Sequence, residues 1–314
     1  MLDRLVFSFS VVFPLFVLIA LGMVLKRQKF FDSDWVAQTN RFVFRIALPA
    51  SMFNSVYSAR VDLLERVPAL VFLLSALGIL FVFMLWFIPR IVPQPGRRGI
   101  IIQGLVQSNT ILLGIPLMTN LYGDAGAGEL SALLALVIPF FNVVAVISFS
   151  LHGKDSTSPN WGAIGKSIVT NPLILATFAA LAMTSLQLYL PLAIERSIGD
   201  IARIASPLSL LALGAGFHMG IGQNLRQLLA TTVARLVLVP SIMLTAAIAL
   251  GFRGTPLAAM LIIFAAPLAV ASFVMSYEYG ADSEFCGQLI VFTTLGSCLT
   301  LFGFIFALSS WGLI

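Results

Sequence analysis

The sequence has little charge and almost no cysteine or histidine. Only 10% of its 314 residues are charged, and it contains two cysteines and two histidines. An ordinary soluble domain has roughly 25% charged residues. Paired-histidine metal patterns, phosphate-cradling glycine loops, nucleophile elbows and Asp-rich diphosphate motifs are absent, so the sequence favours neither an enzyme nor a metal or cofactor site. Cys286 and Cys298 lie too far apart on one predicted helix to form a disulfide.

Apolar residues fill the chain instead, at 59% of the total. No water-soluble fold could bury so much apolar surface. Because a membrane-spanning helix needs about 20 mainly apolar residues, ten spans with short connections use the whole chain and leave no stretch for a soluble domain. We therefore predict an all-α membrane protein with ten transmembrane helices near residues 6–25, 42–59, 68–89, 100–121, 130–151, 167–187, 201–219, 233–251, 256–277 and 286–308.

The basic residues are scattered between the apolar segments, which indicates membrane topology and no nucleic-acid partner. With the amino terminus outside, the inner loops hold ten lysines and arginines and the outer side holds six. The positive-inside rule then predicts that both termini are extracytoplasmic. We expect a multi-pass protein of the cell inner membrane, with the lipid bilayer as its surroundings.

An internal repeat divides the chain into two halves. The string Arg-Ile-Ala-Leu-Pro at 45–49 recurs as Arg-Ile-Ala-Ser-Pro at 203–207, which is 158 residues later. Two dipeptides recur at nearly the same offset. Since each half has five spans, the second half must enter the membrane from the opposite side, which makes two inverted five-helix repeats. The predicted boundaries are 1–151 for the first repeat, 152–166 for a cytoplasmic linker and 167–314 for the second repeat.

Inverted repeats commonly place a binding site at the membrane midplane, between helices broken at glycine and proline. The candidates are the fourth and ninth predicted helices. Pro116 has no N–H for the carbonyl of Leu112, and Gly114 weakens the helix further. Two packed helices with simple kinks are the alternative. The predicted substrate-binding residues are Gln107, Asn109, Thr110, Gly114, Pro116, Pro267 and Ser272.

The organisation favours a secondary transporter over a channel, a receptor or a membrane-embedded enzyme. A channel would be expected to show a filter-like sequence or a continuous polar pore lining. A receptor would be expected to carry sensing or output domains. His218, near the inner end of the seventh predicted helix, is a weaker candidate for a proton relay because a lone histidine near an interface is more often structural.

The string Ser-Asn-Thr-Ile-Leu-Leu-Gly-Ile-Pro-Leu at 108–117, followed by Leu-Tyr-Gly at 121–123, resembles the auxin efflux carrier family in its short bacterial branch. Residues 207–215 are similar to a second stretch of that branch. The resemblance implies a ten-helix fold with two repeats, crossing helices 4 and 9, and transport of organic anions such as auxin in plants or malonate and malate in bacteria. Asn109 and Pro116 match the family's crossover residues, whereas Ser272 stands where the plant carriers have proline.

The predicted function is therefore a secondary transporter that moves small organic anions by alternating access around a midplane site. No Lys, Arg or His occurs within 99–121 or 256–277, so we expect the positive ends of half-helices to hold the anion, with Asn109 and Thr110 as side-chain donors. A sodium-coupled symporter of the bile acid symporter type is the alternative. The substrate, the transport direction, the coupling ion and the oligomeric state, including a homodimer, stay open, and neither function needs a cofactor.

Overall fold

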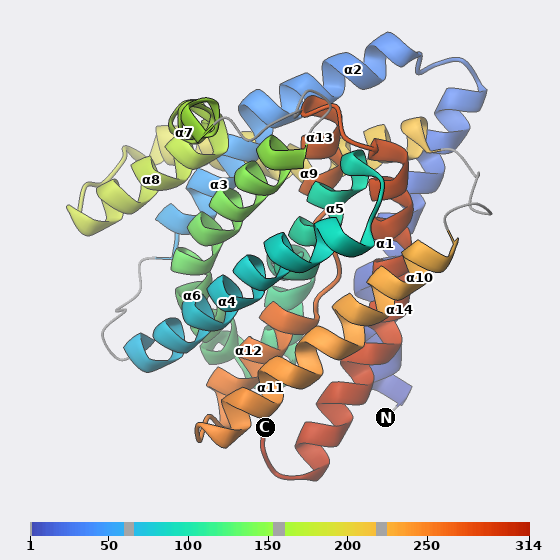
Figure 1. Ribbon diagram of the computed structural model, residues 1–314. Coiled ribbons are helices and arrows are strands. Elements are labelled where there is room, and N and C mark those ends of the chain that lie inside the picture. Colours follow the sequence, from blue (N-terminus) through green and yellow to red (C-terminus); the bar gives the residue numbers. More distant parts are fainter. Residues whose placement is uncertain (1, 60–65, 153–160, 218–224) are drawn as a thin grey trace.

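The computed structural model describes residues 2–59, 66–152, 161–217 and 225–314. His218 and most of the predicted linker lie outside these ranges. Within them, all regular structure is helical (Figure 1). The helices are α1 (Leu2–Arg27), α2 (Ser33–Phe42), η1 (Val43–Ala47), α3 (Leu48–Tyr57), α4 (Val67–Ile91), α5 (Pro95–Val106), η3 (Thr110–Gly114), α6 (Ile115–His152), α7 (Trp161–Thr170), α8 (Pro172–Ser185), α9 (Leu192–Gly216), α10 (Leu225–Val233), η5 (Ala234–Leu238), α11 (Val239–Ala249), α12 (Gly254–Ala265), α13 (Ala271–Glu278) and α14 (Ser283–Ser310).

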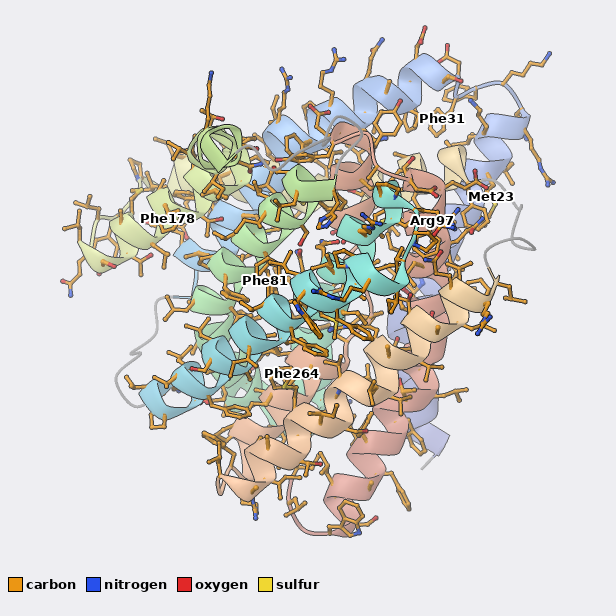
Figure 2. All side chains as sticks on the ribbon, in the orientation of Figure 1. Met23, Phe31, Phe81, Arg97, Phe178 and Phe264 are labelled. Carbon is orange, nitrogen blue, oxygen red and sulfur yellow. The ribbon has the colours of Figure 1, made fainter. Side chains whose placement is uncertain are left out.

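Five of the described helical stretches are long and apolar enough to cross a membrane: Val67–Ile91, Pro95–His152, Leu192–Gly216, Leu225–Ala249 and Ser283–Ser310. Many large apolar side chains point outward from the bundle. Figure 2 shows Phe178 on the outer side of α8, where it is 53% exposed, whereas Phe264 of α12 is fully buried among the helices. Such an apolar exterior is stable only in lipid. The protein is an integral membrane protein.

The helices differ from the predicted spans in several places. Helices α9 and α10 begin at Leu192 and Leu225, before the predicted starts near 201 and 233. The second helical stretch begins at Ser33 instead of near 42, because the Asp32 carboxylate caps it by accepting a hydrogen bond from the N–H of Trp35 at 2.7 Å. Helix α7 begins at Trp161, within the predicted linker. Between Pro95 and His152 no loop separates the fourth and fifth spans, and the chain turns instead at Gly123, whose φ is 65°.

The three short π-helical segments η1, η3 and η5 share one sequence feature. Each ends two residues before a proline, which is Pro49, Pro116 or Pro240. A proline ring lacks an N–H and collides with the carbonyl four residues earlier, and that carbonyl lies inside the π segment in all three cases. The wider π turn makes room for the ring while the chain stays helical, so these prolines bend the helices without ending them.

The helices form two groups. In the first, α1 packs along α9, and α3 packs against both α8 and α9. Gly22 and Gly214 allow the close approach of α1 and α9, since a Cβ on either residue would collide with backbone atoms of the other helix. The second group contains α4, α5, α6, α10, α11, α12 and α14. In Figure 1, α1 begins and α14 ends at the lower end of the molecule, and the turn from α13 to α14 lies at the upper end.

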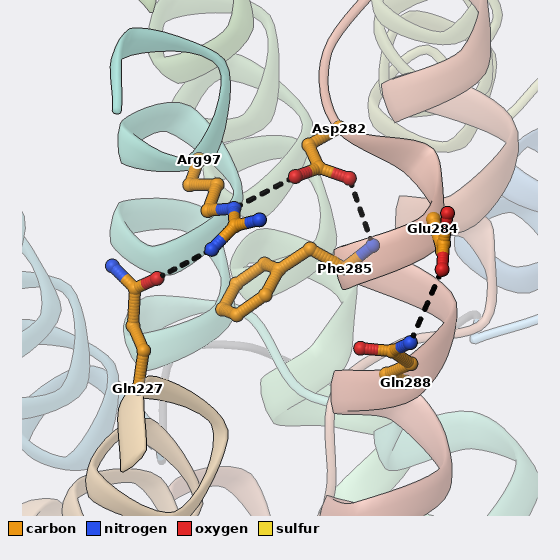
Figure 3. A network of polar contacts seen from close by, with 6 residues as sticks. All are labelled: Arg97, Gln227, Asp282, Glu284, Phe285 and Gln288. Atoms are coloured by element: carbon orange, nitrogen blue, oxygen red, sulfur yellow. Dashed lines mark hydrogen bonds and ion pairs between the residues drawn. The ribbon is translucent and has the colours of Figure 1, made fainter. Parts of the chain in front are cut away.

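A polar network closes this upper end (Figure 3). Arg97, at the start of α5, donates to the carboxylate of Asp282 at 2.7 Å and to the side-chain oxygen of Gln227 at 3.0 Å. Asp282 in turn caps α14 by accepting from the N–H of Phe285 at 3.0 Å. Glu278 lies 3.9 Å from Arg45 of η1. Glu278 at the end of α13 and Asp282 after it are therefore each matched by an arginine from another helix at the same end of the molecule.

Candidate functional site

The interruption after α5 and the interruption after α12 contact each other. Helix α5 ends at Val106, and the chain leaves the helical conformation at Gln107 before η3 begins at Thr110. Helix α12 ends at Ala265, and α13 begins at Ala271. The N–H of Asn109 donates to the carbonyl of Pro267 at 2.8 Å. The two chain breaks are thus joined to each other by a backbone hydrogen bond.

Pro267 also allows a second hydrogen bond between the two breaks. In a continuous helix, the carbonyl of Ile263 would accept from the N–H of residue 267, but proline has none. The freed carbonyl instead accepts from the hydroxyl of Ser108 at 2.7 Å. Each break therefore satisfies backbone groups that the other leaves without a helical partner.

A cavity of about 80 Å³ lies beside the crossing of the two breaks. The first helix group contributes residues of α3 and α9 to its wall. The second contributes residues of α6 and of both breaks. The cavity therefore lies between the two groups of helices, where a relative movement of the groups would change its access. Its lining residues are Leu48, Ser51, Met52, Gln107, Ser108, Asn109, Thr110, Ile111, Leu112, Ile138, Phe141, Asn142, Ser206, Ser209, Ala269, Val270 and Ala271.

Three of the seven residues predicted from the sequence line this cavity: Gln107, Asn109 and Thr110. The other four lie around it without lining it. A Cβ on Gly114 would come within 2.5 Å of the Ile262 side chain, so this glycine lets η3 approach α12. Pro116 follows η3, and Pro267 contributes its carbonyl to the crossing.

Ser272, the seventh, is fully buried in α13 and accepts a hydrogen bond from the Gln103 side chain at 2.8 Å. The same Gln103 nitrogen donates to the side-chain oxygen of Gln107 at 2.7 Å. Gln103 thereby connects α13 to the cavity wall. Ser272 supports the position of Gln107 without touching the cavity itself.

The cavity wall is rich in hydrogen-bond donors. Among the contacts of the described residues, the Asn109 amide, the Thr110 hydroxyl and the Gln107 amide nitrogen have no protein partner. The helix that starts at Thr110 and the helix that starts at Ala271 both lack a side-chain cap. A helix N-terminus carries about half a positive charge. The wall can therefore stabilise negative charge without a formal cation.

Sequence reasoning missed several residues of the wall, among them Ser51 and Ser209. These two are separated by the repeat offset of 158 residues, as are Leu48 and Ser206. Leu48 and Ser206 belong to the repeated strings at 45–49 and 203–207, and Ser51 and Ser209 follow two residues after the end of each string. Extending the repeat by two residues identifies these two serines.

Arg235 is one of the ten basic residues that the positive-inside count assigns to the inner loops, and the sequence gives no reason to place it near the crossing. In the structure it lies inside a helical segment and not in a loop, so that assignment is wrong. Arg235 belongs to η5, is 1% exposed, and donates to carbonyls at the ends of both α5 and α12. A cation is therefore present at the two breaks, but it comes from η5, it binds backbone carbonyls and it does not line the cavity.

A larger hollow of about 220 Å³ lies near the end of α13 and the junction of α7 and α8. Its polar groups already bind one another. The Asn171 side chain donates to the Tyr279 hydroxyl at 3.1 Å and also caps α8. In the described part of the chain, no three His, Cys, Asp or Glu residues gather as a metal site would require. The crossing is the better candidate because its donors lack protein partners.

Comparison with known proteins identifies the protein family. A family model described as "Membrane transport protein" matches residues 7–159 and 161–305, which is nearly the whole chain. The chain belongs to this membrane transport family, the auxin efflux carrier family. It is 28% identical to a protein of Rhizobium meliloti (strain 1021) named "Putative malonate transporter", with 97% of each chain covered.

Two further relatives come from a plant and a bacterium. The chain is 22% identical to "Auxin efflux carrier component 8" of Arabidopsis thaliana, with 95% of this chain and 96% of the relative covered. It is 21% identical to "Uncharacterized transporter YfdV" of Escherichia coli (strain K12), with 91% and 93% covered. This member of the auxin efflux carrier family is a membrane transporter, and the predicted resemblance is confirmed over the length of the chain.

Proposed function

We propose that the protein is a secondary transporter that moves small organic anions through the cavity at the crossing of the two helix breaks. One observation carries the proposal. Two uncapped helix N-termini, at Thr110 and Ala271, border the same small cavity as the unpaired donors of Gln107, Asn109 and Thr110. Helix N-termini and amide donors together are the groups with which proteins hold carboxylates and phosphates.

Small anions fit this site better than aromatic ones. A cavity of about 80 Å³ has room for several water molecules, since one water needs about 10–15 Å³ of such space. A short carboxylate needs a similar volume, whereas an auxin-like indole would require the two helix groups to separate. The name of the Rhizobium relative, a putative malonate transporter, supports the same choice of substrate. We therefore propose a malonate- or malate-like carboxylate as the substrate.

We further propose that the chain crosses the membrane ten times as two inverted five-helix repeats. Several matched features support this arrangement. Val67–Ile91 and Leu225–Ala249 each have 25 residues and begin 158 residues apart. Lys29 and Gln187 have the same offset, and they alone among the described non-glycine residues have positive φ, at 60° and 53°.

The two residues joined by the backbone hydrogen bond at the crossing, Asn109 and Pro267, are also 158 residues apart. In inverted repeats, alternating access arises when one group of helices rocks against the other around a fixed site. A cavity placed between two helix groups fits that mechanism. We propose a location in the cell inner membrane with both termini extracytoplasmic, on the charge bias of the loops.

The test is uptake of radiolabelled carboxylates into proteoliposomes. We expect saturable uptake of three- to four-carbon carboxylates, with competition by other carboxylates and little competition by the matched amide and amine. An amide or amine that competes as well as the carboxylate would exclude an anion site. Sodium and pH gradients are imposed in separate arms, because uptake that requires sodium would favour the alternative symporter of the bile acid type.

A further inference from the structure

Arg235 is the most unusual charged residue in the described membrane region. It is one of the largest fully buried side chains, and all its hydrogen bonds go to backbone carbonyls. Its Nε and one terminal nitrogen both bind the carbonyl of Ala266, at 3.1 and 2.8 Å. The other terminal nitrogen binds the carbonyl of Leu105 at 3.0 Å. A weaker contact of 3.4 Å reaches the carbonyl of Ile263.

These carbonyls are the ones that the two breaks release. The Leu105 carbonyl would accept from the N–H of Asn109 in a continuous helix, but that N–H is bound to the Pro267 carbonyl. The Ile263 carbonyl faces the missing N–H of Pro267. Ala266 is the residue that follows the end of α12. The guanidinium thus binds the C-terminal ends of α5 and α12 together.

The charges balance at this point. Each helix C-terminus carries about half a negative charge, so two of them amount to about one unit, which one guanidinium neutralises. The ion pairs found among the described residues involve other arginines, namely Arg45, Arg66, Arg97 and Arg203. The partner of Arg235 is therefore the pair of helix ends and not a carboxylate.

In secondary transporters with broken helices, the unwound carbonyls and the C-terminal ends of half-helices are the groups that coordinate a coupling cation. Here a side chain of the protein already occupies them. We propose that Arg235 is a tethered cation that takes the place of a coupling cation at the crossing. The crossing then keeps its geometry without bound sodium, and removal of the side chain leaves a site for a small free cation.

This proposal rests on the proposed transport function for its consequence, sodium-independent uptake, but its structural part is tested without a substrate. Thermal unfolding of the purified protein is measured in sodium chloride, in choline chloride, and with guanidinium or urea added at low millimolar concentration. Urea is the control because it is planar and of similar size but uncharged. The variants are Arg235→Ala, Arg235→Lys and the matched control Arg226→Ala, which removes an exposed arginine of the same helical stretch.

For the wild-type protein we expect the same unfolding temperature in sodium and in choline. Arg235→Ala should unfold at a lower temperature and recover part of the loss with guanidinium or sodium, but not with urea or choline. Arg235→Lys keeps the charge with fewer donors, so its loss should be smaller. Arg226→Ala should behave like the wild type in every salt.

In proteoliposomes, Arg235→Ala should transport at least about tenfold less, since even one hydrogen bond from a charged donor is worth about that factor. Recovery with urea equal to that with guanidinium would overturn the proposal, because shape and not charge would then matter. The proposal would also be overturned if sodium, compared with choline, raised the unfolding temperature of the wild-type protein. If Arg235→Ala does not fold, the comparison of wild-type unfolding in sodium and choline and the unfolding of Arg235→Lys still test the proposal. A failed substrate screen would refute the proposed function but leave these unfolding results intact.

Discussion

Replacement of Asn109 by alanine should severely weaken substrate binding and transport and leave the fold nearly unchanged. The Asn109 amide makes no hydrogen bond within the described structure. The bond that joins the two breaks comes from its backbone N–H, which alanine retains. The free energy of unfolding should therefore change by no more than about 0.5 kcal/mol, as for other side chains without structural contacts.

The effect on substrate should be much larger. A hydrogen bond to a charged group contributes about 1.5–3 kcal/mol, and each 1.4 kcal/mol corresponds to a factor of about ten. Loss of the amide should raise the substrate concentration for half-maximal uptake about 10- to 150-fold. The assay is concentration-dependent uptake into proteoliposomes, with thermal unfolding measured on the same preparation.

Two further alanine variants are the controls. Asn171 caps α8 by accepting from the N–H groups of Leu173 and Ile174 at 2.9 and 3.4 Å. Asn171→Ala should therefore lose about 0.5–2 kcal/mol of stability with little change in half-maximal uptake. Asn54→Ala changes a half-buried amide of α3 that does not line the cavity, and should alter neither quantity. Normal uptake by Asn109→Ala, or a loss of stability like that of Asn171→Ala, would show that Asn109 is structural.

The remaining predictions concern topology and packing. In a cysteine-free background, Lys29→Cys and Gln187→Cys should react with membrane-impermeant thiol reagents from opposite sides of the membrane, because an inverted repeat places equivalent positions on opposite faces; reaction from one side would refute the inverted arrangement. Gly214→Ala should lower stability by about 1–3 kcal/mol, since its Cβ would collide with the backbone of α1. The control is Gly78→Ala, because a Cβ at Gly78 meets nothing within 4 Å. This change should stabilise the protein by up to about 1 kcal/mol through helix propensity. An equal loss of stability for both variants in thermal unfolding would contradict the close α1–α9 packing.

Much of the fold could be predicted from the sequence, because the bilayer imposes strong local rules. Apolar runs of membrane length and their flanking charges identified helices in every predicted span, within the described residues. Proline chemistry is equally local: Pro116 and Pro267 indicated where the fourth and ninth helices are disturbed. The start of α2 at Ser33 was missed because its cap, Asp32, lies outside the apolar run.

The candidate site was only partly predictable, for a physical reason. Gln107, Asn109 and Thr110 lie on one stretch of chain, so their common location was readable from spacing and from the break beside them. Ser51 and Ser209 reach the same cavity from two helices of the other group. No local rule indicates how two helix groups pack, and only the repeat offset related these serines to each other.

The sequence by itself determined that this protein is helical and membrane-embedded, and that its fourth and ninth predicted helices carry residues that disfavour regular helix. These properties follow from apolar length, charge bias and the missing N–H of proline, all of which act within a few residues. The tertiary structure alone decided what completes the crossing. Arg235 is far in sequence from Leu105, and it reads as an ordinary interfacial arginine until the fold places it against the carbonyls that both breaks release. A buried charge acquires its partner only when distant helix ends meet.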